Sequence, residues 1–82
     1  MIKELPGDKL VDAIGCFIVL YSRPTRSKYV IKLISVDMEN SHMRYEIISG
    51  SKKGMVRTGK FVNDRPFRIF DEDSLVKALL EV

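Results

Sequence analysis

The chain has 82 residues, of which 45% are hydrophobic and 30% are charged, and its net charge is +3 at pH 7. This composition is typical of a globular protein, and the length suffices for one domain, residues 1–82, with a small core. It excludes a disordered chain, and it excludes a transmembrane helix because the longest apolar run, Ile14 to Tyr21, is far shorter than the roughly 20 residues that span a bilayer.

The single cysteine and the single histidine limit the chemistry that the chain can perform. One cysteine cannot form an internal disulfide, and one cysteine with one histidine cannot complete a zinc site. The N-terminal sequence MIKELPGD has no apolar segment of the kind found in signal peptides. We therefore expect a cytoplasmic protein with no cofactor, no metal and no membrane association.

Charge is distributed unevenly along the chain. Residues 23–68 carry eleven Lys or Arg against four acids, a net charge of +7, whereas residues 1–22 carry −1 and residues 69–82 carry −3. If the acidic ends pack beside the middle, much of its charge is neutralised inside the domain. If they pack elsewhere, a basic face remains.

The segment LPGDKLVDAIG allows two interpretations, a short helix or a strand. In the first, Asp8 is the N-cap of a helix with Leu10, Val11 and Ile14 on one face. Gly15 then stands where a helix C-terminus favours glycine. A helix of two turns is marginal alone and must dock on the rest of the domain.

Three strands are predicted in the next part of the chain. CFIVLYS, residues 16–22, is continuously apolar, which is typical of a strand buried on both faces at the centre of a sheet. KYVIKLISVDM and HMRYEIIS are two further strands, and a four-residue loop joins them if Asp37 pairs with His42. The same register places Val36 opposite Met43, Ile34 opposite Tyr45, and Lys32 opposite Ile47.

The stretch GMVRTGKF, Gly54 to Phe61, matches most of a nucleotide-binding P-loop. A P-loop needs Ser or Thr after its lysine, where this chain has Phe61, and it must run into a helix. Pro66 and the turn-forming pair before Arg65 make a helix improbable there. The sequence therefore favours a different origin for both glycines.

That origin is a β-hairpin with Gly54 in the left-handed conformation of a three-residue loop, closed by Ser51 and Met55. Its register places Ile47 opposite Gly59, Glu46 opposite Lys60, and Tyr45 opposite Phe61. A neighbouring aromatic ring would then cover Gly59, which has no side chain of its own.

The C-terminal third begins with a strand, FRIF, in which Phe67 and Ile69 share one face. DEDS marks the start of a helix, with acids where the positive end of the helix dipole favours them. The helix continues through SLVKALLEV and places its main apolar stripe on Leu75, Ala78, Leu79 and Val82.

Together these elements predict an α+β domain that is mainly antiparallel β. We expect a curved meander of four or five strands, or a small SH3-like or OB-like barrel, with a C-terminal helix and, under the first interpretation of residues 8–15, a short N-terminal helix.

No combination of residues indicates catalysis, and we expect a protein that is not an enzyme. Ser41 and His42 are adjacent, so in a strand their side chains point to opposite faces. Cys16 is expected to be a buried, inert thiol. The acids of residues 71–73 are explained by helix capping.

The basic residues suggest a function in binding nucleic acid. Small antiparallel sheets and barrels bind nucleic acid with cationic loops along a groove and with exposed aromatic rings. The predicted nucleic-acid-binding residues are Arg23, Arg26, Lys28, Lys52, Lys53, Arg57, Lys60, Arg65 and Arg68. The available aromatic residues are Tyr21, Tyr29, Tyr45, Phe61 and Phe70, unless these rings form the core.

The alternative function is a protein-binding adaptor or inhibitor, in one version a homodimer. Val76 and Leu80 fall beside the main stripe of the C-terminal helix and widen its apolar arc. These two residues are the predicted partner interface.

Overall fold

The computed structural model describes residues 2–22, 24–61 and 66–82, with Ile2 described by its backbone alone. The strands are β1 (Ile2–Pro6), β2 (Phe17–Ser22), β3 (Ser27–Asp37), β4 (His42–Ile47), β5 (Val56–Lys60) and β6 (Pro66–Phe70). The helices are two 3-10 helices, η1 (Gly7–Ala13) and η2 (Glu72–Ser74), and one α-helix, α1 (Leu75–Leu80).

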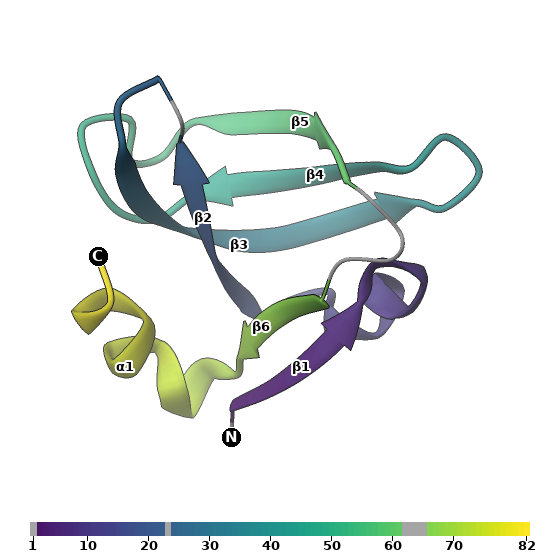
Figure 1. The fold of residues 1–82 in the computed structure, drawn as a ribbon, viewed down its shortest axis with the longest axis horizontal. Coiled ribbons are helices and arrows are strands. Elements are labelled where there is room, and N and C mark those ends of the chain that lie inside the picture. Colours follow the sequence, from purple (N-terminus) through teal and green to yellow (C-terminus); the bar gives the residue numbers. More distant parts are fainter. Residues whose placement is uncertain (1, 23, 62–65) are drawn as a thin grey trace.

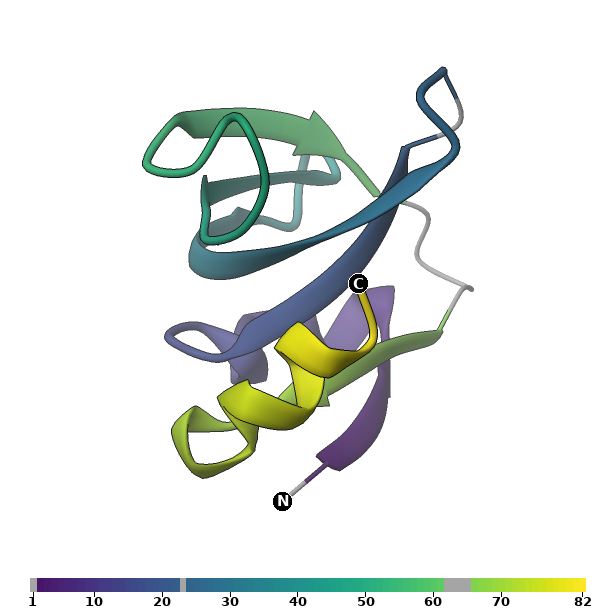
Figure 2. The same cartoon turned by 90° about the vertical axis from the view of Figure 1, so that its left-hand side faces the viewer.

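The protein is mainly antiparallel β, with one open six-stranded sheet in the order β1-β6-β2-β3-β4-β5 and a C-terminal helix. The prediction of a closed barrel is therefore wrong, since β1 and β5 are the two edges of the sheet. The predicted number of four or five strands is also too small, because no strand is predicted from the sequence at residues 2–6, where β1 lies. The sheet is strongly bent: β3, β4 and β5 form one layer, β1 and β6 form the other, and β2 crosses between them (Figures 1 and 2).

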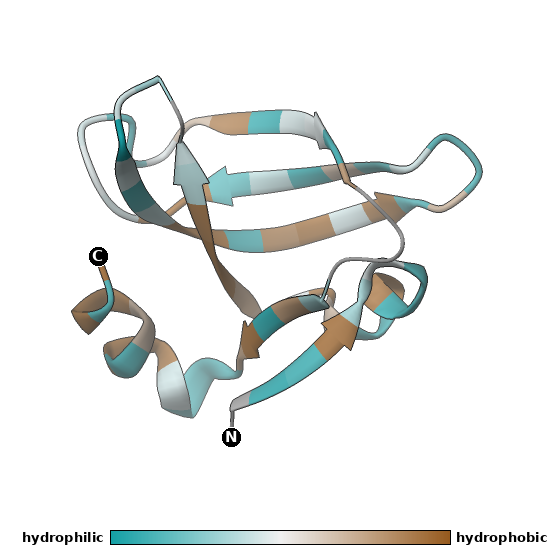
Figure 3. Ribbon diagram, viewed as in Figure 1, coloured by the Kyte–Doolittle hydropathy of each residue, from teal (hydrophilic) through white to brown (hydrophobic). Residues whose placement is uncertain are grey.

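The central position predicted for β2 is confirmed. At Phe17 and Ile18 this strand pairs with β3 on one edge and with β6 on the other. The two side chains point to opposite faces of the sheet, as strand alternation requires. Figure 3 shows hydrophobic residues gathered along β2 and the middle of β3.

The core consists of two clusters, one on each face. The larger cluster lies inside the bend and contains Leu10, Ala13, Ile18, Ile31, Leu33, Met43, Tyr45, Ile47, Phe61 and Ile69. The smaller cluster lies under α1 and contains Phe17, Val30, Phe70 and Ala78.

Residues 7–13 form the predicted N-terminal helix, but as a 3-10 helix with a different buried face. Its buried residues are Gly7, Leu10 and Ala13, which are three positions apart, because a 3-10 helix has three residues per turn. Val11 and Ile14, expected inside, are each 46% exposed. The expected N-cap is also absent: Pro6 occupies that position and its side chain makes no capping hydrogen bond. Gly15 ends the segment with φ +90°, as predicted.

The hairpin of β3 and β4 follows the prediction only near its loop. Asp37 pairs with His42 and Val36 with Met43, as expected. A β-bulge between Leu33 and Ser35 then shifts the register by one residue, so Tyr45 lies opposite Leu33 rather than Ile34. The bulge turns Ile34 outward, where it is 41% exposed, and Ile47 pairs with Ile31 instead of Lys32.

The register predicted for β4 and β5 is wrong, although the hairpin and its left-handed glycine are confirmed. Tyr45 lies opposite Arg57 rather than Phe61, because the loop is longer than three residues and includes a second left-handed glycine, Gly50. Gly54 has φ +92°, and its N–H donates to the Ile47 carbonyl at 2.7 Å. A ring does cover Gly59: a Cβ built there would meet the Tyr45 ring at 3.4 Å. Lys60 ends a strand, so the stretch is not a P-loop.

The C-terminal helix presents a different face to the core than the sequence predicted. Ser74 and Ala78 are buried and Leu75 is half-buried, whereas Leu79 and Val82 are 38% and 48% exposed. The predicted start at residues 71–74 is the 3-10 helix η2, whose N-cap Asp71 accepts a hydrogen bond from the Ser74 N–H at 3.0 Å, and α1 follows it from Leu75. Strand β6 agrees with its prediction, with Phe67 and Ile69 in the same cluster.

The period of η1 gives a test by substitution. We expect Leu10→Ala to lower the free energy of unfolding by about 2–5 kcal/mol, because Leu10 is fully buried. Val11→Ala is the matched control and should cost less than about 1 kcal/mol, because its side chain is half in water. Urea denaturation of both variants measures the difference. Equal losses would mean that residues 7–13 pack as an ordinary α-helix.

Candidate functional site

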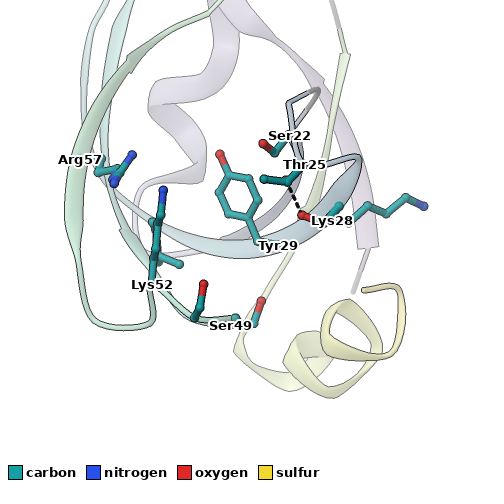
Figure 4. Close-up of a pocket in the computed structure, with 11 residues that line it drawn as sticks. Ser22, Thr25, Lys28, Tyr29, Ser49, Lys52 and Arg57 are labelled. Atoms are coloured by element: carbon teal, nitrogen blue, oxygen red, sulfur yellow. Dashed lines mark hydrogen bonds between the residues drawn. The ribbon is translucent and has the colours of Figure 1, made fainter.

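A cleft of about 280 Å³ is lined by the turn that joins β2 to β3, the N-terminal end of β3, the loop before β5, and β5 itself. Figure 4 shows the Tyr29 ring standing in its middle, with Arg57 and Lys52 on one side and Thr25 on the other. This space is called the first cleft below. Its lining residues come from segments that are distant in sequence, at residues 22–29 and 47–57.

Two hydrogen bonds hold the loop before β5 against β3. The Ile48 N–H donates to the Val30 carbonyl at 2.8 Å, and the Val30 N–H donates to the Ser49 hydroxyl oxygen at 2.9 Å. Because the loop is fixed at this point, Lys52 is carried to the wall of the first cleft rather than out into solvent along the sheet.

The first cleft is suited to an anion. Three exposed cations line it, Lys28, Lys52 and Arg57, and no carboxylate belongs to its described lining. Five further lining residues carry hydroxyl groups that can donate hydrogen bonds, namely Ser22, Thr25, Ser27, Ser49 and Ser51. In Figure 4 the Lys28 ammonium points away from the centre of the cleft, so its charge acts at the rim.

Tyr29 is the central aromatic residue of the site, and its surroundings change its acidity. Burial raises the pKa of the Tyr29 hydroxyl above its usual value of 10.0, and the neighbouring Tyr45 raises the pKa further, through its charge and through a hydrogen bond between the two side chains. Arg57 acts in the opposite direction, because its positive charge favours the phenolate.

A second cleft, of about 610 Å³, adjoins the first and shares Lys28 and Tyr29 with it. It lies at the edge of β2 that is unpaired among the described residues, between the C-terminal half of that strand and the facing residues of β5 and β6. Three cations line it, Lys28, Lys60 and Arg68, together with one acid, Glu81.

The positive charge of Arg68 is partly used inside the protein. Its guanidinium donates to the Glu81 carboxylate at 2.6 Å and lies 5.3 Å from the centre of the Phe70 ring. Glu81 therefore does not present an unpaired negative charge to the second cleft, and Arg68 contributes less positive charge than Lys28 and Lys60 do.

The structure thus brings together five of the predicted nucleic-acid-binding residues, Lys28, Lys52, Arg57, Lys60 and Arg68, around two adjoining clefts. Arg26 and Lys53 are exposed but line neither cleft. Arg23 and Arg65 lie outside the described residues.

The predicted aromatic residues divide between surface and core. Tyr21 is 58% exposed, and Tyr29 is half-buried at the cleft. Tyr45, Phe61 and Phe70 are buried. The predicted partner interface lies on the outer side of α1, where Val76 is 68% exposed and Leu80 is 79% exposed.

His42 and Cys16, whose side chains could take part in catalysis, lie in surroundings that indicate a structural role. Asp37 receives hydrogen bonds from the Asn40 side chain and backbone, which hold the pKa of its carboxyl group below the usual value, and His42 faces it across the ladder. Cys16 is half-buried rather than buried as expected. Within residues 2–22, 24–61 and 66–82, no group of three or more His, Cys, Asp or Glu could hold a metal ion.

Sequence reasoning missed the hydroxyl residues of the first cleft. The signal was present, since Ser and Thr are dense in residues 22–27 and again in residues 49–51. It could not be used, because the two segments are brought together by the anchoring of the loop before β5 to Val30, which no local pattern indicates.

Comparison with known proteins found no match, whether with family models, curated proteins or solved structures. In the described part of the chain, no helix has the length and apolar character needed to cross a membrane. The two clefts and the residues that line them are therefore the features that bear on function.

The surroundings of Tyr29 predict a pH titration with opposite effects in two variants. Tyr45→Phe should lower the pKa of Tyr29, because it removes a hydroxyl that favours the neutral form, and Arg57→Gln should raise it, because it removes a charge that favours the phenolate. Both pKa shifts are measured by following the absorbance of ionised tyrosine against pH. The titration curve of the same protein with Tyr29→Phe is subtracted, so that the signal of Tyr29 alone remains.

The raised pKa of Tyr29 also predicts how the stability of the protein changes with pH. The folded protein still holds the Tyr29 proton at pH values where the unfolded chain has released it. The free energy of unfolding should therefore fall as the pH rises from the usual tyrosine pKa of 10.0 through the raised pKa of Tyr29. A Tyr29 pKa that moved in the same direction in both variants would contradict the arrangement in Figure 4.

Proposed function

We propose that this protein is a small non-catalytic module that binds nucleic acid through the phosphate backbone. The observation that carries the proposal is the gathering of Lys28, Lys52 and Arg57 around one cleft whose described lining has no carboxylate. Phosphate oxygens accept hydrogen bonds from ammonium, guanidinium and hydroxyl groups, and all three kinds line this cleft.

The distribution of charge supports the same proposal. Four of the cleft cations belong to β3, to β5 and to the loop before β5. The acids of residues 71–73 lie at η2, away from both clefts, and Glu81, which follows α1, pairs with Arg68 of β6. The clefts therefore keep a positive potential that attracts a polyanion. A cytoplasmic location remains a prediction that accompanies this function.

Binding of this kind should depend strongly on salt. We expect a labelled oligonucleotide of about 12 nucleotides to lose affinity steeply between about 50 and 200 mM salt, because each phosphate contact releases a bound counterion. Lys28→Glu, Lys52→Glu and Arg57→Glu in one variant should weaken binding and lower the salt slope by about 2, since each contact contributes roughly 0.7 on a single strand. Fluorescence anisotropy measures both quantities.

The matched control reverses three exposed cations that lie away from the clefts, Lys3, Lys9 and Lys77. This control changes the net charge by the same amount, so it separates the cleft from the overall charge. It should retain the slope of the unmodified protein. Equal losses in both variants, or no binding by the unmodified protein at the lower salt, would contradict the proposal.

A second candidate function is self-association through α1. Its motive is the exposure of Val76 and Leu80, which lie one turn apart on the helix. In a twofold dimer with antiparallel helices, each Val76 would meet Leu80 of the second copy, so the same patch serves both copies. The six-residue helix offers little area beside the roughly 800 Å² per partner of a standard interface, so such a dimer would be weak.

Light scattering over a range of protein concentrations tests this second function. If it holds, the mass should rise above that of a monomer as concentration increases, and Leu80→Glu should return it to monomer without loss of stability, because Leu80 is 79% exposed in the single chain. Ile34→Glu, at the exposed bulge of β3, is the control and should still associate. A monomer at every concentration would exclude self-association.

A further inference from the structure

We propose that the second cleft is a base-binding subsite, so that the protein binds single-stranded nucleic acid in preference to duplex. This inference rests on the proposed function, which assigns the phosphate backbone to the first cleft. The two clefts share Lys28 and Tyr29, so one strand can occupy both, with a phosphate in the first and its base in the second.

The rim of the second cleft combines an exposed aromatic ring with cations. Tyr21 is 58% exposed and lies directly opposite Lys28 in the pairing of β2 with β3. Proteins that bind single-stranded nucleic acids use an exposed aromatic ring next to a cation, because the ring stacks on a base and the cation contacts the adjoining phosphate. Lys60, across the opening on β5, supplies a second cation at the rim.

The floor of the second cleft is apolar and buried. Met43, Tyr45 and Phe61 line it and are 5–7% exposed, so a flat heterocycle entering the cleft meets a surface without charge. Its volume of about 610 Å³ is within the range of about 300–1,000 Å³ typical of sites for small organic groups. Gly59 also lines the cleft, and the lack of a side chain there leaves room beside the Tyr45 ring, which a Cβ would meet at 3.4 Å.

The shape of this site favours an unpaired base. The bases of a duplex are stacked and paired inside the helix, so they reach an apolar floor only after a costly unstacking, whereas the bases of a single strand are already available. A duplex could still place its phosphates at the first cleft, which predicts weaker, backbone-only binding of double-stranded nucleic acid.

The test compares three labelled probes of equal length, about 12 nucleotides. They are a thymine single strand, an abasic single strand with the same phosphates, and a duplex. Fluorescence anisotropy at about 50 mM salt should give an affinity for the thymine strand about 5- to 150-fold above that for the abasic strand, because one stacked base contributes that factor. The duplex should bind no better than the abasic strand.

Two variants at the rim place the effect at the second cleft. Tyr21→Ala should remove the advantage of the thymine strand and leave the affinity for the abasic strand unchanged, whereas Tyr21→Phe should keep the advantage, because stacking needs the ring and not the hydroxyl. Neither variant is expected to unfold the protein, since Tyr21 is mostly exposed. The chain has no tryptophan, so quenching of tyrosine fluorescence by the thymine strand gives an independent readout.

The outcomes separate this inference from the function on which it rests. Equal binding of thymine and abasic strands, both sensitive to the charge reversals at the first cleft, would overturn the base-binding subsite and leave backbone binding intact. An advantage of the thymine strand that survives Tyr21→Ala would also overturn it. Failure of all three probes to bind would overturn both proposals.

Discussion

The fold depends on the double pairing of β2 at Phe17 and Ile18. These two residues join the layer of β3, β4 and β5 to the layer of β1 and β6, because the sheet order passes from one layer to the other only through β2. The same two side chains enter the two core clusters, Ile18 inside the bend and Phe17 under α1. A short stretch of backbone pairing is thereby reinforced by burial on both of its faces.

The helices support this junction from opposite sides. The 3-10 helix η1 packs against β3 and β6 inside the bend and contributes Leu10 and Ala13 to the larger cluster. Helix α1 packs on the other face against β2, β3 and β6, where Ala78 is fully buried. Each helix therefore contacts strands of both layers. This matters in a chain of 82 residues, because a small core leaves only a narrow margin of stability.

The open side of the sheet follows from how short the junction is. Beyond Ile18, β2 pairs with β3 alone, so its other edge is left without a strand from Val19 onward among the described residues. The second cleft lies along this edge. A closed barrel would have paired that edge and filled the space with side chains, so the feature that makes the barrel prediction wrong is also the feature that leaves the second cleft open.

The sequence predicts the elements of this protein better than it predicts how they pair. Residues 16–22 are identified as a central strand because a continuous apolar run requires burial on both faces, and Gly15 and Gly54 are identified because positive φ favours glycine. The bulge at Ile34 is not predictable from alternation, since Leu33 and Ile34 are both apolar and the pattern does not say which of them faces the core. The three-residue period of η1 was not predictable for a related reason: in the seven residues of this helix and the one that follows them, apolar residues occur at spacings of both three and four.

The candidate site was predictable in its composition and not in its geometry. The run of cations in residues 23–68 indicated a basic face only if the acidic ends packed elsewhere, and that condition concerns tertiary structure. The structure meets it largely: Glu81 is the single acid in the described lining of either cleft, and Arg68 holds it in an ion pair. The other acids of the C-terminal segment, at residues 71–73, belong to η2 and the residue before it, and they line neither cleft (Figure 2). The double pairing at Phe17 and Ile18 therefore accounts for the bend of the sheet and for the open edge of β2 along which the second cleft lies.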